Sequence, residues 1–406
     1  MENLKKYKKF VGAEKLGQIH ERAEKLGDKH ILNINSTYQG GGVAVILNSL
    51  IPLMNNLGID VGWRILHGPP DFFITTKKFY NAIQGEKIHF TKQKQKIYLE
   101  NCERFSSFTH IHHDAVIIHD IQPLPLVKFY KKRQPWIWRC HSDASHPNKE
   151  VFNYLKKNFI NHYDYSVFLS KKFLQPGLKP KQVIMQPSID PLDIKNKELT
   201  ERTVNHYLNK FGVPTDKPLV CQVSRFDKWK DHFGMIKIFK KVREKVDCRL
   251  VLIGCMALDD PMGQQIYEKI IKKVSGQEDI IILNVVNDIL VNALQRKASV
   301  IIQKSIMEGF GLTVSEALWK GTPVVASNVG GITEQIINGK NGYLLSPYDF
   351  DGFAARIVKL LKDSKLRATL GKQGRETVKN KFLITTHLLN WINLLNQVFE
   401  KEKKAK

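Results

Sequence analysis

Two glutamates enclose a glycine turn in the second half of the chain. Glu308 and Glu316 flank the segment Gly309-Phe310-Gly311-Leu312-Thr313-Val314-Ser315. A carboxylate accepts two hydrogen bonds from neighbouring hydroxyl groups, and the free N–H groups of a turn that opens a helix attract anions. The spacing therefore predicts a site for a sugar or a phosphate. Thr313-x-x-Glu316 also matches a capping box, in which Glu316 would bond only to the start of its own helix.

A cationic loop follows the apolar segment 219–223. It reads Ser224-Arg225-Phe226-Asp227-Lys228-Trp229-Lys230. The guanidinium of Arg225 suits two phosphate oxygens at once, whereas the ammonium of Lys230 acts as a point charge. Because ligands of open parallel sheets bind beyond the carboxyl ends of strands, this position favours a diphosphate-binding loop. The alternative is a basic surface loop without a ligand.

Three consecutive glycines, Gly40, Gly41 and Gly42, stand between the apolar segment 31–34 and an expected helix at 43–57. Glycines let backbone N–H groups approach a phosphate, and a helix N-terminus adds partial positive charge. The dinucleotide-binding fingerprint is absent, because Val45 occupies its third glycine position. A plain flexible turn is the alternative interpretation.

Two polar clusters follow apolar segments of the first half. His119-Asp120 ends one segment, and His141-Ser142-Asp143 ends the next. Their placement predicts a substrate role. We expect no metal site, because neither a helical i, i+4 histidine pair nor a cysteine partner accompanies them. Asp259-Asp260, before Pro261, reads as a turn instead of a metal site.

The elements that must position these residues alternate between strands and helices. Short apolar runs predict strands that are buried on both faces, as in parallel sheets. The expected strands are 31–34, 61–66, 115–118, 136–140, 166–169 and 183–185 in the first half, and 219–223, 250–253, 280–285, 300–302, 323–326 and 343–345 in the second. The expected helices are 43–57, 149–159, 235–245, 264–274, 314–319, 353–361 and 385–399. Strand–helix alternation in both halves predicts an α/β protein with two doubly wound domains.

The boundary between the domains is expected within 186–200, where two prolines interrupt a segment of little periodicity. We assign 1–190 to an N-terminal acceptor-binding domain and 191–384 to a C-terminal nucleotide-sugar-binding domain. Residues 385–406 form a terminal helix, which crosses back to the first domain, and a basic tail. A length of 406 residues suits two domains of ordinary size.

Composition limits the class of protein. The five cysteines show no C-x-x-C spacing, so neither a zinc cage nor a disulfide framework is indicated. The N-terminus lacks the apolar segment of a secretory signal, and no apolar run approaches the ~20 residues that span a bilayer. We expect a cytoplasmic protein.

The net charge of +24 is concentrated in lysine runs at 5–9, 128–133, 171–181 and 237–245 and in the tail. It leaves three interpretations open: a solvated surface, peripheral contact with an anionic membrane, or a nucleic-acid binder. No helix-turn-helix or aromatic-basic platform supports the last, so we expect no nucleic-acid partner. A homodimer is also left open.

With these motifs assembled, the chain resembles the retaining glycosyltransferases of family 4, which have the GT-B fold. Glu308-x7-Glu316 with its inner Gly-Phe-Gly, Arg225 with Lys230, and Gly40–Gly42 match that family's pattern over essentially the whole chain. It is similar in particular to the trehalose glycosyltransferring synthases. That narrower resemblance rests on segments such as NINSTYQGGGVAVILNSLIPLMNNLGIDVGW and MEGFGLTVSEALWKGTPVV. The sequence departs from the family's pattern at Asp231, where a glycine is expected nearby.

The resemblance implies a role for each motif and a cleft between the two domains. Arg225 and Lys230 would hold the donor diphosphate, and Glu316 the ribose. The donor-binding residues are Gly41, Gly42, Arg225, Lys230, Glu308, Gly309, Phe310, Gly311, Leu312, Thr313 and Glu316. The acceptor-binding residues are Asp120, His141 and Asp143, and the residues implied in catalysis are His141, Arg225, Lys230 and Glu308.

The implied reaction moves glucose from UDP-, ADP- or GDP-glucose to glucose, with retention, to give trehalose. No cofactor or metal is expected, since the two cations neutralise the diphosphate. Two alternatives remain within enzymes: phosphorolysis of trehalose, and glycosylation of a lipid or polysaccharide.

Overall fold

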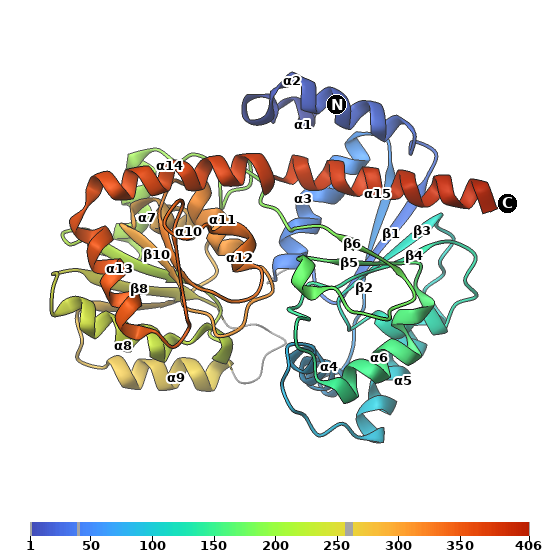
Figure 1. The fold of residues 1–406 in the computed structure, drawn as a ribbon, viewed down its shortest axis with the longest axis horizontal. Helices are drawn as coiled ribbons and strands as arrows, with labels where there is room; N and C mark the ends of the chain where they lie inside the picture. The colour runs from blue at the N-terminus through green and yellow to red at the C-terminus, as the bar shows by residue number, and fades with distance from the viewer. Residues whose placement is uncertain (1, 39–40, 256–262, 406) are drawn as a thin grey trace. The chain divides into compact units, whose positions relative to one another are not determined.

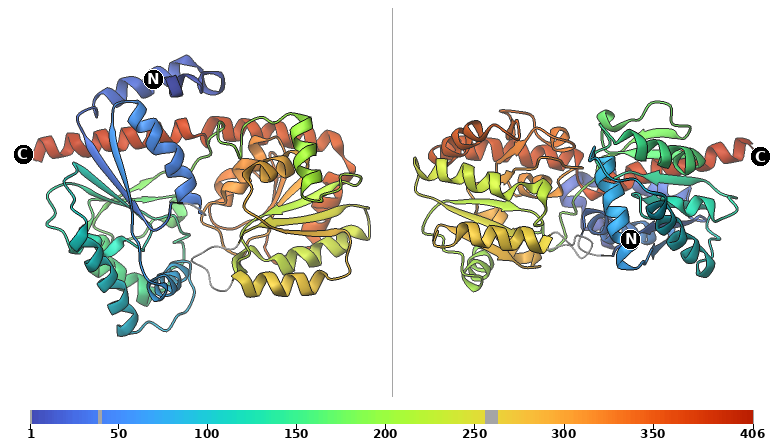
Figure 2. Two further views of the ribbon diagram at one scale, coloured as in Figure 1. Left: turned by 180° about the vertical axis from the view of Figure 1, so that it is seen from behind. Right: turned by 90° about the horizontal axis from the view of Figure 1, so that it is seen from below.

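The chain forms two compact units. The computed structural model describes residues 2–38, 41–255 and 263–405. Unit 1 consists of Met1–Ser188 with Ile384–Lys406, and unit 2 of Ile189–Leu383. Each unit contains a parallel six-stranded sheet with helices on both faces (Figures 1 and 2). The prediction of two doubly wound α/β domains is confirmed.

The sheet of unit 1 has the strand order β2-β1-β3-β4-β5-β6. Its strands are β1 (His30–Asn35), β2 (Asp60–Ile65), β3 (Ala115–His119), β4 (Trp136–Arg139), β5 (Tyr165–Phe168) and β6 (Lys181–Ile184). The chain order reverses between β1 and β3, and such a switch point opens a crevice at the carboxyl ends of the strands. The segments that follow β1 and β3 are therefore the ones placed to meet a ligand.

Helices cover both faces of this sheet. They are α1 (Glu2–Lys5), α2 (Lys8–Glu24), α3 (Gly42–Asn56), α4 (Pro70–Ile83), α5 (Lys92–Phe108), α6 (Lys149–Asn158) and α15 (Ile384–Ala405), with short 3-10 turns η1 (Leu124–Lys128), η2 (Ile160–His162) and η3 (Lys171–Phe173). The C-terminal helix α15 packs on α2 and α3 (Figure 1). Lys15 donates to the hydroxyl of Thr386 at 2.6 Å, and Arg22 donates to the amide oxygen of Asn393 at 2.6 Å.

The sheet of unit 2 has the order β12-β11-β10-β7-β8-β9. Its strands are β7 (Leu219–Val223), β8 (Arg249–Gly254), β9 (Ile280–Asn284), β10 (Val300–Gln303), β11 (Val324–Ser327) and β12 (Tyr343–Leu345). Its helices are α7 (Glu201–Lys210), η4 (Lys228–Lys230), α8 (His232–Arg243), α9 (Gly263–Val274), α10 (Asp288–Lys297), α11 (Leu312–Trp319), α12 (Ile332–Gln335), α13 (Phe350–Lys362) and α14 (Ser364–Lys381). The switch point of this sheet lies between β7 and β10.

Every predicted strand is present within two residues at each end, but the helix prediction is incomplete. It misses α2, α4, α5, α7, α10 and α14 as well as the four-residue helices α1 and α12. In α5, for example, only Tyr98, Asn101 and Cys102 are buried, so the apolar stripe is too thin to predict a helix. Within the described ranges, no helix combines the length and apolar character that crossing a membrane requires.

Candidate active site

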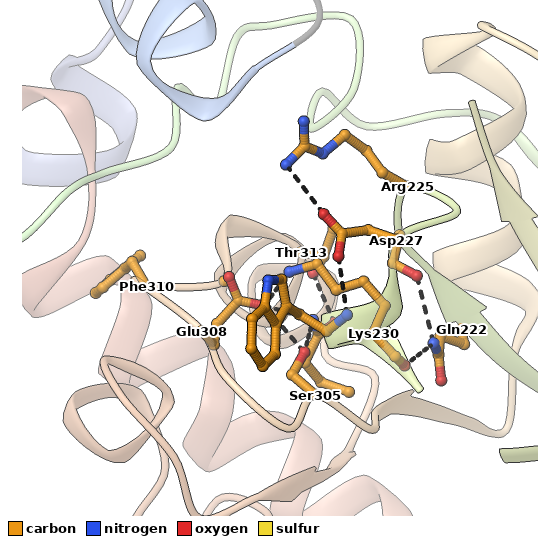
Figure 3. Close-up of polar contacts among 12 residues, drawn as sticks. Gln222, Arg225, Asp227, Lys230, Ser305, Glu308, Phe310 and Thr313 are labelled. Carbon is orange, nitrogen blue, oxygen red and sulfur yellow. Dashed lines mark hydrogen bonds and ion pairs between the residues drawn. The ribbon is translucent and has the colours of Figure 1, made fainter. Parts of the chain in front are cut away.

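The switch point of unit 2 brings together two loops that lie about 80 residues apart in the sequence. One follows β7 and carries Arg225 and Lys230, and the other follows β10 and carries Glu308. The backbone N–H of Ile306 donates to the carbonyl of Trp229 at 2.8 Å. Nζ of Lys230 lies 2.5 Å from Oε2 of Glu308 (Figure 3). The two motifs that the sequence singled out thus form one site.

Glu308 is held through one of its two carboxylate oxygens. Oε2 accepts from Lys230, from Nε2 of Gln303 at 2.9 Å and from the hydroxyl of Ser305 at 3.0 Å. Its side chain is 11% exposed. In the described part of the chain Oε1 accepts no hydrogen bond, so this oxygen remains available to hydroxyl groups of a ligand.

Arg225 reaches further into solvent than Lys230. Its side chain is 32% exposed, against 15% for Lys230, and its guanidinium lies 3.8 Å from the buried carboxylate of Asp227 (Figure 3). The same Asp227 accepts from the backbone N–H of Trp229 at 2.8 Å, which fixes the turn between the two cations. A partly exposed guanidinium on a fixed loop suits the capture of a diphosphate.

The glycine turn after β10 is fixed by helix α12. Gly311 has φ +81°, and a Cβ there would lie 3.3 Å from Cγ of Glu308. Nε2 of Gln335 donates to the carbonyl of Phe310 at 2.5 Å. Backbone geometry, and not only sequence spacing, therefore requires glycine beside the carboxylate of Glu308.

Helix α11 begins at Leu312, with Gly311 as its N-cap residue, and no described side chain caps its first turn. The capping-box interpretation of Thr313 and Glu316 is therefore wrong. The hydroxyl of Thr313 instead donates to Oε1 of Gln303 at 2.9 Å, so Gln303 links this helix to Glu308. Among the described residues, the backbone N–H of Val314 donates to the carbonyl of Gly311 at 2.9 Å, whereas those of Leu312 and Thr313 remain available to an anion.

Glu316 is the fifth residue of α11 and so lies beyond the first turn of this helix. It is buried, and Nε2 of Gln295 lies 3.4 Å from its Oε2. Lys320 donates to Gln295 at 2.8 Å and to the carbonyl of Glu316 at 3.2 Å. Burial lowers the pKa of Lys320 to about 7, against the opposing effect of the Glu316 carboxylate. Glu316 thus belongs to a buried polar network at the base of the helix.

Asp231 lies in the segment after Lys230, near which the family's pattern leads us to expect a glycine. Its φ is +44°, in the left-handed region that suits glycine. The carboxylate caps helix α8 by accepting from the N–H of Gly234 at 3.0 Å, and it lies 2.6 Å from Nζ of Lys304. Lys304 is fully buried, with Phe350 and Phe353 against its ammonium. The ion pair between Asp231 and Lys304 therefore links the loop after β7, which carries Lys230, to the loop after β10.

In unit 1, helix α3 begins at Gly42, with Gly41 as its N-cap residue. Both glycines therefore lie at the helix start, where free N–H groups are available to an anion. Gly40, like Asp259 and Asp260, lies outside the described residues.

Two histidines and an asparagine form a buried chain of hydrogen bonds in unit 1. Nδ1 of His119 lies 3.0 Å from Nε2 of His141, and Nε2 of His119 lies 3.0 Å from Oδ1 of Asn33. Because Oδ1 of Asn33 only accepts, Nε2 of His119 must donate, and Nε2 of His141 must donate to Nδ1 of His119. Burial lowers the pKa of His119 to about 3 and that of His141 well below its usual range, so both rings are neutral. This tautomer leaves Nδ1 of His141 as an acceptor.

The two predicted aspartates of unit 1 hold loops in place. Asp120 has φ +61°, and its Oδ1 accepts from the backbone N–H of His141 at 2.8 Å. Burial raises the pKa of Asp120 to about 7, although the N–H of His141 and the nearby Arg139 lower it. Oδ1 of Asp143 accepts from the N–H of Ser145 at 2.9 Å and from its hydroxyl at 2.6 Å. The structure thus joins Asp120 to His141, whereas Asp143 shapes the next turn.

The sequence prediction missed the residues that orient the predicted ones. In unit 2 these are Gln303 and Lys304, and in unit 1 Asn33. Gln303 ends a buried strand and Asn33 lies within one, so an isolated polar residue in an apolar run was the available signal for these two. Lys304 follows β10 directly and gave no such signal. Among the residues that the structure describes, no group of three potential metal ligands occurs.

Comparison with known proteins defines the class first. Residues 33–175 match the family described as the N-terminal domain of trehalose synthase, and residues 205–377 match glycosyl transferases group 1. Two solved structures share the fold. Sucrose-phosphate synthase from Thermosynechococcus elongatus has a TM-score of 0.72 at 17% identity, covering 92% of this chain and 100% of that one. Anabaena HepE in complex with UDP-glucose has a TM-score of 0.67 at 16% identity, covering 91% and 99%. Fold and site together define a GT-B glycosyltransferase.

The particular family follows from sequence identity. Trehalose synthase from Thermococcus litoralis is 44% identical over 400 residues, covering 97% of this chain and 96% of that protein. The chain belongs to the trehalose synthase family of glycosyltransferases. The resemblance inferred from the motifs is thereby confirmed.

Proposed function

We propose that the protein transfers glucose from a nucleoside-diphosphate glucose to the anomeric hydroxyl of glucose, with retention of configuration, and forms trehalose. The observation that carries this proposal is the convergence, in unit 2, of Arg225, Lys230, Glu308 and the glycine turn on one switch point. Two cations and a helix N-terminus suit a diphosphate leaving group, and a carboxylate with a free oxygen suits sugar hydroxyls.

In the proposed reaction the bond between C1 of the donor glucose and the phosphate oxygen breaks, and a bond forms between C1 and the acceptor's anomeric oxygen. The acceptor proton passes to the departing phosphate oxygen. The leaving group gains negative charge as the bond breaks, so Arg225, Lys230 and the N-terminus of α11 stabilise the transition state. No separate base is needed.

Lys230 has a carboxylate partner within the site. Its Nζ pairs with Glu308 at 2.5 Å. We propose that donor binding transfers part of this interaction to the phosphate, which leaves Glu308 to bind hydroxyl groups of the transferred glucose. Glu316, in its buried network, binds the ribose.

Acceptor binding is proposed for unit 1. His141 presents Nδ1 as an acceptor because Asn33 and His119 fix its tautomer. Asp120 holds the backbone of His141. The ring therefore accepts a hydrogen bond from a sugar hydroxyl and does not act as a proton donor near neutral pH.

The test is incubation of the purified protein with UDP-, ADP- and GDP-glucose in turn, each with ¹³C-labelled glucose, and analysis of the products by NMR. We expect labelled α,α-linked trehalose and one equivalent of free nucleoside diphosphate. Glucose 1-phosphate formed from trehalose and orthophosphate, without turnover of any nucleotide-glucose, would replace the proposal with phosphorolysis. Transfer of glucose only into a lipid or polysaccharide fraction would show that the acceptor is a lipid or a polysaccharide and not free glucose.

A further inference from the structure

Two lysine runs that are distant in the sequence meet in unit 1. Lys179, from the run at 171–181, lines an open pocket with a volume of about 480 Å³. Lys132, from the run at 128–133, donates to the carbonyl of His162, a residue that lines the same pocket. The other lining residues are Asn153, Lys156, Lys157 and Asn161. Part of the unexplained positive charge of the chain is therefore gathered around one hollow.

This pocket differs in charge balance from a second one in unit 2. The second pocket, of about 460 Å³, is lined by Lys240 and Arg243 together with Glu244, Glu278 and Asp279. There the cations face acids, and Arg243 pairs with Asp279 at 2.6 Å. In the described part of the chain, no carboxylate lines the first pocket. A lysine-rich composition alone does not explain this difference, because both pockets belong to the same basic chain.

The acid close to the first pocket is already engaged. Asp164 accepts from Lys132 at 2.7 Å and from the backbone N–H of Trp136 at 2.8 Å. Burial lowers the pKa of His162, and Lys128, Lys132 and Lys179 lower it further. The imidazole thus lies in a positive field that Asp164 does not cancel.

The groups of the pocket are mostly hydrogen-bond donors. Lys156, Lys157 and Lys179 carry ammonium groups. Oδ1 of Asn161 accepts from the backbone N–H of Lys179 at 3.1 Å, which leaves its Nδ2 to donate. Ammonium groups and amide N–H donors suit phosphoryl oxygens.

The pocket lies towards the amino ends of the strands of unit 1, whereas the candidate acceptor residues lie at their carboxyl ends. Its residues precede strands or end a helix: Lys156 and Lys157 lie in the last turn of α6, His162 ends η2, and Lys179 precedes β6. His119 instead ends β3, and His141 follows the carboxyl end of β4. An anion bound here would not compete with a sugar at His141.

We propose that this pocket is a second binding site, specific for a small polyanion that carries two or more phosphoryl groups. Its volume is in the range of small-molecule sites, and a hollow encloses a compact ligand better than a flat surface does. The proposal does not depend on the transfer reaction proposed above.

The test uses the full chain and inorganic pyrophosphate, titrated calorimetrically at fixed ionic strength. The test variant replaces Lys156, Lys157 and Lys179 with glutamine. The control variant replaces Lys359, Lys362 and Lys365, which are exposed and of which the first two lie in the last turn of α13, and so makes the same change in net charge. Because pyrophosphate also suits the donor site, every titration is repeated on an Arg225→Ala background.

On the Arg225→Ala background, we expect the protein with intact pocket lysines and the control variant to bind pyrophosphate. On the same background, the test variant should bind pyrophosphate at least tenfold more weakly. ¹³C-histidine NMR, with His162→Gln for assignment, should show the pKa of His162 rising when pyrophosphate binds. Equal binding by the test variant, equal losses in test and control variants, or no binding would each overturn the proposal. So would binding to phosphatidylserine vesicles without binding to pyrophosphate. Pyrophosphate binding that is lost in Arg225→Ala alone would be binding at the donor site. The experiment therefore distinguishes failure of the second-site proposal from failure of the proposed function.

Discussion

Replacing Asp231 or Lys304 alone should destabilise the protein, whereas replacing both together should leave its stability nearly unchanged. The ammonium of Lys304 is fully buried and lies 2.6 Å from the Asp231 carboxylate. At an effective dielectric constant of about 20, that separation gives an attraction of about 6 kcal/mol, which offsets the cost of removing both charges from water. Asp231 also adopts φ +44°, which costs an ordinary residue about 1–2 kcal/mol.

Replacing Asp231 with glycine alone removes the strain but leaves the buried ammonium without its partner. Breaking a buried pair costs about 3–5 kcal/mol, so Asp231→Gly should lose about 2–4 kcal/mol of unfolding free energy. Lys304→Met should lose less, about 1–2 kcal/mol, because the Asp231 side chain is 20% exposed and water can reach it. The double variant should return to within about 1 kcal/mol of wild type, since glycine suits the backbone and methionine suits the apolar site.

The assay is urea unfolding of the four proteins, followed by circular dichroism, with transfer activity measured in parallel. The double-mutant cycle should give a coupling energy of about 2–6 kcal/mol, the sum of the two single losses less the loss in the double variant. Because Asp231 follows Lys230 directly, the single variants should raise KM for the nucleotide-glucose and the double variant should restore it. Additive losses, with the double variant the least stable, would refute the reasoning.

Three further predictions concern single residues. Gly311→Ala should reduce the free energy of unfolding by about 1–2 kcal/mol and impair transfer, since its φ is +81° and the new Cβ would meet Glu308. The control is Gly339→Ala, where φ is +78° and the space around the new Cβ is open. Equal activity of both variants would contradict the steric argument. Glu308→Gln should lower kcat/KM about tenfold or more, because a neutral amide replaces the carboxylate proposed to accept from hydroxyl groups of the transferred glucose; unchanged kinetics would exclude the carboxylate from the site. His119 is neutral in the folded protein, so its contribution to stability is complete above pH 6.5 and falls as the pH drops towards 3, by about 3 kcal/mol at pH 4.5. His119→Gln should flatten this part of a stability–pH curve measured by thermal unfolding. A curve identical to that of the wild type would refute the buried, neutral state of His119 in the chain of hydrogen bonds.

The strands were predictable because parallel strands that are buried on both faces leave near-continuous apolar runs. The loops after β7 and β10 were predictable for the same reason, since each carries its charged residues directly behind such a run. The helices were less so: α14 contains Gly371 and Gly374, and its mean composition is polar, so packing and not local preference makes it helical.

The residues behind the site were not predictable from spacing. Lys304 reads as one more lysine in a basic chain, and only the fold shows that it is buried beside Asp231. The departure from glycine at Asp231 was visible in the sequence, but its compensation, 73 positions later, was not. Thr313 illustrates the opposite error, because its spacing from Glu316 suggested a local cap while its hydroxyl bonds to Gln303 on a neighbouring strand.

The measurement that tests the account most directly is the kcat/KM of Arg225→Ala for the nucleotide-glucose, beside Arg202→Ala, an exposed arginine of α7, as the charge-matched control. Both variants should retain the circular dichroism spectrum of the wild type. Loss of one group that stabilises the leaving diphosphate should slow Arg225→Ala on the order of a hundredfold and leave the control unchanged. Wild-type turnover by Arg225→Ala would contradict the assignment of the diphosphate to this loop.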